Sequence, residues 1–128
     1  MSWLENEVKE VMERKGMSSI TATEYQIRAA ETAIFPKNDA LEYLTLGLTG
    51  EAGEIANKVK KLIRDGADKE NYYERLYEIE KELGDVLWYC AMLATEVDAN
   101  LGKIMEANLN KLADRKARNA LQGSGDNR

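Results

Sequence analysis

The sequence predicts an all-α protein, a bundle of about four long helices, from three observations. Apolar side chains recur at steps of three or four residues over long stretches, which is the period of one helix face. Glycine and proline are sparse, with nine glycines and one proline among 128 residues. No stretch alternates apolar and polar residues as a half-buried strand does. A chain of this length fits a single domain.

The first predicted helix is short. Residues 3–15 have a helical pattern that ends at Gly16. Thr23 is the expected N-cap of a second helix, and this helix is expected to run to about Ile34 because Pro36 follows shortly.

Three further helices are predicted after the second. Asn38 or Asp39 is a suitable cap for the first, and residues 64–68 are expected to form the loop that ends it. The apolar stripes of these helices run through residues 41–62, 72–97 and 101–112. The expected parts of the chain are an N-terminal extension (1–20), a helical domain (21–118) and a flexible polar tail (119–128).

The composition excludes several functions. With no histidine and one cysteine, Cys90, the chain cannot use Ser-His-Asp or Cys-His catalysis, an internal disulfide or a multi-cysteine zinc site. A net charge of −5 argues against binding to a nucleic acid polymer. The apolar run from Val86 to Ala94 is far shorter than the roughly 20 residues of a membrane helix. We therefore expect a soluble cytoplasmic protein, in which carboxylates would favour Mg²⁺, Mn²⁺ or Ca²⁺ as a bound metal.

A short acidic motif occurs twice. Two acids lie three residues apart with a glycine directly before the second, first at Glu51 and Glu54 and then at Glu82 and Asp85. Acids at this spacing share a helix face, so neighbouring antiparallel helices can bring all of them together, and a divalent cation would relieve their repulsion. The alternative is that they are solvated surface acids paired with lysines.

Two details strengthen the metal interpretation. Asp85 precedes a strongly apolar stretch, so its carboxylate is expected to be largely buried and to need a partner. Gly53 and Gly84 are unfavourable inside helices by roughly 1 kcal/mol each relative to alanine, which suggests that the two helices approach closely there.

Polar side chains continue the same helix faces. Lys58 and Lys61 follow the first motif, Tyr89 follows the second, and the last helix has a stripe of polar and basic residues, Asn108, Lys111, Arg115 and Arg118. Cations beside a metal cluster suit a polyphosphate. The alternative for the last stripe is a solvated face whose basic residues favour the helix macrodipole.

The motifs EAGE, ELGD and ANLNKLADRKAR, in this order between Tyr25 and Arg118, resemble the MazG-like all-α nucleoside triphosphate pyrophosphohydrolases. The resemblance implies hydrolysis of an NTP or dNTP to the monophosphate and pyrophosphate with Mg²⁺, or with Mn²⁺ as a substitute. The implied metal ligands are Glu51, Glu54, Glu82 and Asp85. The implied nucleotide contacts are Lys58, Lys61, Tyr89, Asn108 and Lys111, to which the basic stripe adds Arg115.

The expected mechanism uses a metal-activated water, which Glu54 positions or deprotonates. Some relatives have a further acid at the position of Gly50. Apolar residues such as Trp3 and Met105 exceed what one inward face accommodates, and together with the resemblance they favour a homodimer or a homotetramer built from dimers.

Other functions remain open. The same scaffold is used by pyrophosphohydrolases acting on dUTP or phosphoribosyl-ATP, and base selection is not visible in the sequence. A non-catalytic helical interaction module is an alternative from another class. A ferritin-like di-iron protein is set aside because it normally needs a Glu-x-x-His pair.

Overall fold

The computed structural model describes residues 2–66 and 69–128, and within these ranges it contains helices and no strand. The all-α prediction is confirmed. The α-helices are α1 (Trp3–Lys15), α2 (Ala22–Ala29), α3 (Ala40–Asp65), α4 (Lys69–Glu96) and α5 (Leu101–Ala117). Two 3₁₀ turns, Ala30–Thr32 and Lys37–Asp39, lie between α2 and α3. In the described ranges, no helix is both long and apolar enough to cross a membrane.

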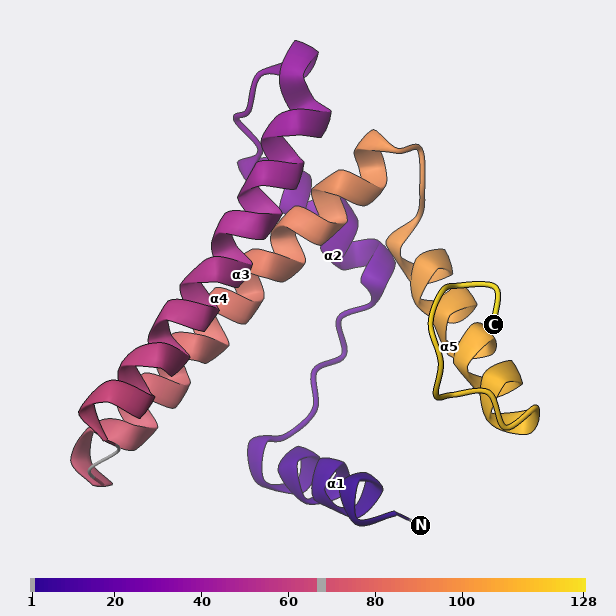
Figure 1. Ribbon diagram of the computed structural model, residues 1–128. Coiled ribbons are helices and arrows are strands. Elements are labelled where there is room, and N and C mark those ends of the chain that lie inside the picture. Colours follow the sequence, from indigo (N-terminus) through magenta and orange to yellow (C-terminus); the bar gives the residue numbers. More distant parts are fainter. Residues whose placement is uncertain (1, 67–68) are drawn as a thin grey trace.

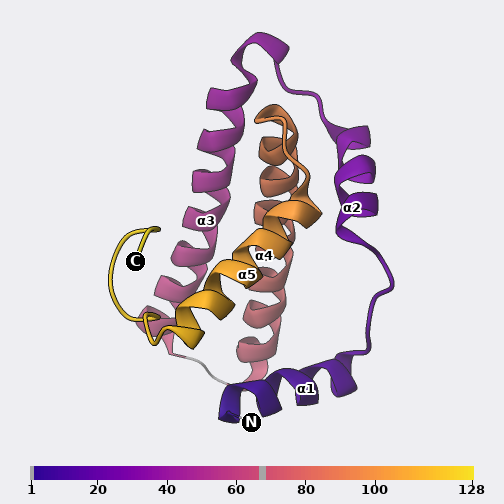
Figure 2. The same ribbon diagram turned by 90° about the vertical axis from the view of Figure 1, so that its right-hand side faces the viewer.

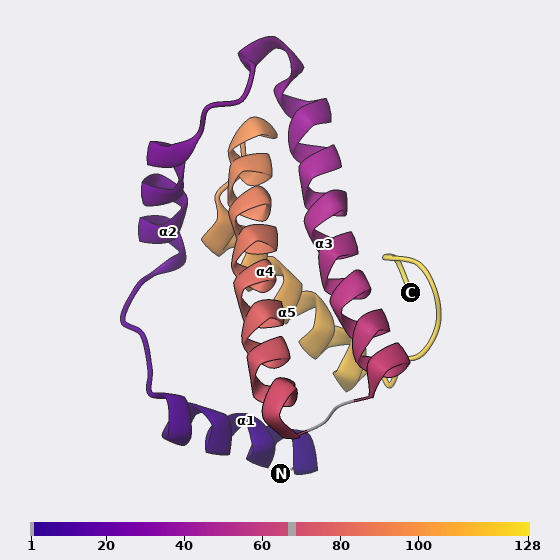
Figure 3. The ribbon, with the colours of Figure 1, turned by 90° about the vertical axis from the view of Figure 1, so that its left-hand side faces the viewer.

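The long helices α3 and α4 form an antiparallel hairpin, and they lie side by side along most of their length (Figures 1 and 2). The short helix α2 packs on the end of α4 that is far from the hairpin loop, and α5 contacts α2 and α4 (Figure 3). The buried core lies where these elements meet and consists of Ala29, Leu44, Ala91, Met92, Ala94 and Leu101. The half of the hairpin that is nearest to its loop is therefore held mainly by contacts between α3 and α4.

Hydrogen bonds from side chains of α2 and α4 hold the helices together at the end of the hairpin that is far from its loop. The Trp88 indole nitrogen donates to the Ala29 carbonyl and to the Thr32 hydroxyl, each at 3.0 Å. The Gln26 amide donates to the Ala99 carbonyl at 3.0 Å and accepts from the Leu101 N–H at 2.8 Å. These bonds satisfy polar groups at the ends of three helices, so they position α2 and α5 relative to α4.

The prediction for the second helix is wrong at both ends. Thr21, not Thr23, is the N-cap, and its hydroxyl accepts from the Glu24 N–H at 3.1 Å. The α-helix ends at Ala29 instead of near Ile34, because the chain tightens into a 3₁₀ turn that presents the Ala29 carbonyl to Trp88. Both differences depend on local bonding that the spacing of apolar residues does not show.

The loop predicted over residues 64–68 begins later than expected. Arg64 and Asp65 form the last turn of α3, and Gly66 ends the helix with a φ of 74°. Residues 67–68 lie outside the described residues.

Two helices end in the same hydrogen-bonded turn. At the end of α4, Asp98 has a φ of 59° and the Ala99 N–H donates to the Ala94 carbonyl. At the end of α5, Asn119 has a φ of 56° and the Ala120 N–H donates to the Arg115 carbonyl. This pattern is the Schellman motif, which reverses the chain direction. The second turn sends residues 120–128 back along α5 (Figure 1).

The helix α1 has the predicted bounds of 3–15 and begins with a capping box between Ser2 and Glu5. It lies apart from the hairpin at the end of an extended linker, with the Trp3 side chain 75% exposed (Figure 1). The whole chain exposes 10203 Å², whereas a folded monomer of this mass typically exposes about 6,800 Å². A single copy therefore leaves much apolar surface uncovered.

Candidate metal and phosphate site

Three of the predicted acids meet on the α3–α4 hairpin. Glu51 from α3 and Glu82 and Asp85 from α4 each place one carboxylate oxygen within 4.8 Å of the others. The spacing of three residues puts Glu82 and Asp85 on one face of α4, and the antiparallel pairing brings that face to Glu51. Glu54, one turn further along α3, is exposed and lies outside this group.

The three acids, called the acidic cluster below, repel each other. The pKa of Glu51 is raised, first by a hydrogen bond with Glu82, then by partial burial, and then by the charges of Asp85, Glu82 and Glu54. Close carboxylates resist simultaneous ionisation unless a cation balances them. Because the donor atoms are hard oxygens from three different side chains, the cluster fits a divalent cation of the Mg²⁺ or Mn²⁺ type.

Two sequence expectations about this site are wrong. Asp85 is exposed, because the apolar side chains that follow it turn to other faces of α4 and leave the carboxylate at the surface. Gly53 and Gly84 do not mark a close approach of the helices, since a Cβ at either position would meet open space. The close approach is at Gly47, where a Cβ would overlap the ring of Tyr89.

Tyr89 lies one turn beyond Asp85 and is partly buried between helices. Its ring centroid is 5.1 Å from that of Trp88, in an edge-to-face arrangement. The pKa of Tyr89 is raised mainly by burial, and also by Tyr43, Glu51 and Asp85. The phenol is therefore a neutral hydrogen-bonding group at the border of the acidic cluster.

The structure also places Tyr25 near Asp85 of the acidic cluster, although the sequence analysis did not identify Tyr25 as a site residue. Burial raises its pKa most, and the nearby charge of Asp85 raises it further. Tyr25 comes from α2, whose placement depends on the bonds of Gln26 and Trp88, so no spacing within the motifs could have indicated it.

The two lysines after the first motif have different surroundings. The Lys58 ammonium lies 3.7 Å from Glu82 and 3.8 Å from Glu78, so it joins α3 to α4 at the edge of the acidic cluster. Lys61, one turn further on, is exposed and lines a shallow hollow with Asn71, Glu74, Arg75 and Glu78.

The polar stripe of α5 is separate from the acids within one chain. Figure 1 shows that α5 diverges from the hairpin. Asn108 on α5 is exposed. Lys111 and Arg115 instead contact Asp126, with N···O distances of 3.0 Å and 3.4 Å. The structure thus brings Lys58 and Tyr89 to the acidic cluster but not the α5 residues.

Fold and site together define an all-helical protein with a cluster of three carboxylates, which could hold a metal ion, on a helical hairpin. The sequence pattern of the MazG nucleotide pyrophosphohydrolase domain matches residues 40–119, which contain both acidic motifs and α5. The chain belongs to this family. It is also similar to the gene 37 protein of Mycobacterium phage L5, with 51% identity over 110 residues that cover 81% of this chain and 96% of the phage protein. No solved structure matches the chain significantly.

Proposed function

We propose that this protein is a cytoplasmic, Mg²⁺-dependent enzyme that hydrolyses a nucleoside or deoxynucleoside triphosphate to the monophosphate and pyrophosphate. The observation that carries the proposal is the convergence of Glu51, Glu82 and Asp85 in a chain of the MazG family. Family membership supports a nucleotide pyrophosphohydrolase, and the oxygen donors favour Mg²⁺ over softer metals.

The residues around the cluster have complementary roles in this proposal. Glu51, Glu82 and Asp85 would hold the divalent cation, which when bound would supply positive charge to the phosphate chain and to the attacking water. Glu54, which is exposed and not part of the cluster, positions the water or accepts its proton. Lys58 balances negative charge beside Glu82, and the neutral phenol of Tyr89 donates a hydrogen bond to the nucleotide.

The proposed site needs a second copy of the chain to be complete. Asn108, Lys111 and Arg115 are proposed to contact the nucleotide, yet α5 diverges from the acidic cluster of its own chain (Figure 1). The exposed area of 10203 Å² leaves ample surface for a partner. A homodimer, or a homotetramer built from dimers, would place the α5 cations of one copy near the acids of another.

A substrate panel tests this proposal. The panel contains ribonucleoside and deoxyribonucleoside triphosphates, with dUTP and phosphoribosyl-ATP for the related activities, and pyrophosphate release is measured with and without Mg²⁺. Release from one or more members only with the metal supports the proposal, and the preferred member identifies the base and sugar. No release from any member contradicts it.

The non-catalytic alternative, a helical interaction module, is favoured by the exposed apolar side chains, including Trp3 and Leu46. Thermal unfolding separates the two functions. The enzyme is expected to gain stability from Mg²⁺ plus a nucleotide, since both bind the folded state. An interaction module predicts no such gain.

A further inference from the structure

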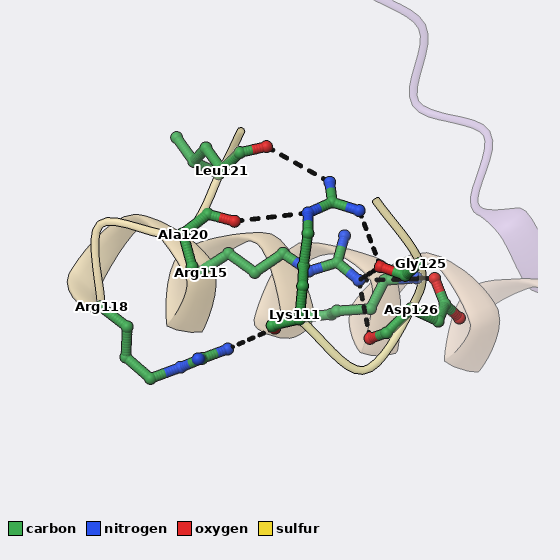
Figure 4. A network of polar contacts seen from close by, with 8 residues as sticks. Lys111, Arg115, Arg118, Ala120, Leu121, Gly125 and Asp126 are labelled. Carbon is green, nitrogen blue, oxygen red and sulfur yellow. Dashed lines mark hydrogen bonds and ion pairs between the residues drawn. The ribbon is translucent and has the colours of Figure 1, made fainter. Parts of the chain in front are cut away.

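Residues 120–128 fold back along α5, and Asp126 in this segment contacts Lys111 and Arg115, as Figure 4 shows. The Lys111 ammonium and the Arg115 guanidinium converge on the same carboxylate oxygen of Asp126, at 3.0 Å and 3.4 Å. The same Arg115 nitrogen also donates to the Asp126 carbonyl at 2.8 Å. Two cations that converge on one carboxylate oxygen also suit a phosphate oxygen, because both are anionic acceptors of hydrogen bonds from Lys and Arg.

Arg115 is unusual among the charged residues of the described chain because its side chain is only 5% exposed. Its Nε has no hydrogen-bond partner in the structure. A buried guanidinium normally has its donors satisfied, so the present contact leaves binding capacity unused. A tetrahedral oxyanion has more acceptor atoms than the single carboxylate of Asp126 and could satisfy more of these donors.

The returning segment has its own internal support. The Arg128 guanidinium donates to the Gly125 carbonyl at 2.7 Å and to the Ala120 and Leu121 carbonyls at 3.3 Å each. Gly125 has a φ of 83°, a conformation that glycine adopts readily and alanine does not. The segment thus has backbone contacts of its own besides the contacts of the Asp126 carboxylate, and it presents that carboxylate to α5.

We propose that residues 125–126 are an internal ligand of the Lys111–Arg115 pair and compete there with the phosphate groups of the nucleotide or of the pyrophosphate product. The consequence for turnover rests on the proposed function, in which these cations contact the nucleotide. The competition for a phosphate anion is a binding equilibrium that needs neither metal nor turnover. The segment must leave before the anion binds, so it lowers the apparent affinity of the site.

Metal-free binding of inorganic pyrophosphate, measured by calorimetry in the presence of EDTA, tests the competition. Two variants weaken the internal ligand in different ways. Asp126→Asn removes its charge, and Gly125→Ala strains its backbone without changing any charge, in a place where the added methyl meets open space. Glu106→Gln is the matched control, because it removes a carboxylate of α5 that pairs with Lys103 and not with the site.

Both test variants are expected to bind pyrophosphate about two- to fivefold more tightly than the unmodified protein, because the Asp126 carboxylate is exposed and its ion pairs are weak, while the control is unchanged. In the NMR spectrum, the Gly125 amide resonance should move to a random-coil position as pyrophosphate saturates the unmodified protein. If Asp126→Asn and Glu106→Gln tighten binding equally and Gly125→Ala does not, only long-range charge is involved and the proposal is wrong. A stationary Gly125 resonance at saturation, or no pyrophosphate binding by any form, also overturns it.

This experiment separates the two proposals. A protein that shows the predicted competition but hydrolyses no triphosphate contradicts the proposed function alone. A protein that hydrolyses triphosphates without the predicted competition contradicts only the internal ligand.

Discussion

At the scale of residues, the decisive feature is the meeting of Glu51 with Glu82 across the hairpin. The raised pKa of Glu51 means that the folded chain holds a proton there more tightly than the unfolded chain does. Above that pKa the ionised group opposes folding, and this cost disappears as the pH falls through the raised pKa. Repulsion within the acidic cluster thus destabilises the folded state, and a bound cation would relieve this repulsion.

Replacing Glu51 with glutamine tests this electrostatic cost. Without metal at pH 7, Glu51→Gln is expected to unfold at a temperature higher by about 3 °C, because one repelling charge is removed. The difference between the two proteins should shrink as the pH falls through the raised pKa of Glu51, above its usual value of 4.5. Calorimetric scans at a series of pH values measure it. A variant that is less stable at pH 7, or a difference that grows toward acid, would show that the acids do not repel.

At the scale of elements, helical periodicity predicted the helices well and their contacts poorly. The apolar stripes located α3, α4 and α5 because a helix must bury one face. The stripes did not show that Asp85 is exposed or that Tyr25 approaches it from α2. These depend on how helices pack, which the sequence of one helix does not encode. For the same reason, the sequence analysis predicted the closest approach of the two helices at Gly53 and Gly84, whereas it occurs at Gly47.

Two glycines of α3 provide a matched test of this packing. Gly47→Ala is expected to lower the free energy of unfolding by about 1–3 kcal/mol, because the added methyl overlaps the Tyr89 ring. Gly50→Ala places the same methyl in open space and should raise stability by roughly 0.5–1 kcal/mol through helix propensity. Urea unfolding of both variants measures the difference. Equal effects of the two substitutions would mean that Tyr89 does not pack on Gly47.

At the scale of the whole molecule, a single copy has a small core and a large surface. Few side chains are fully buried, and Leu46, Leu83 and Leu109 are each more than half exposed. A surface of 10203 Å², against about 6,800 Å² for a compact monomer, is difficult to reconcile with a stable isolated chain. The sequence indicated this excess of exposed apolar surface, since Trp3 and Met105, which it predicted to exceed one inward face, are 75% and 51% exposed. Met92, by contrast, is buried in the core.

The mass in solution tests whether copies assemble. Light scattering at micromolar concentration is expected to give at least twice the 14.4 kDa of one chain, because burial of the exposed apolar side chains favours association. A stable, folded species of 14.4 kDa would show that one chain is sufficient and that the α5 cations do not act on the acids of a partner.

The most direct test of the proposed enzyme is a phosphorus NMR time course of the preferred triphosphate with Mg²⁺. We predict that the monophosphate and pyrophosphate appear at equal rates. Glu82→Gln should slow both by at least about 100-fold while the protein remains helical, and Glu80→Gln, an exposed neighbour on α4, should have little effect. Release of orthophosphate in place of pyrophosphate, or full activity of Glu82→Gln, would contradict the assignment of the acidic cluster as a pyrophosphohydrolase site.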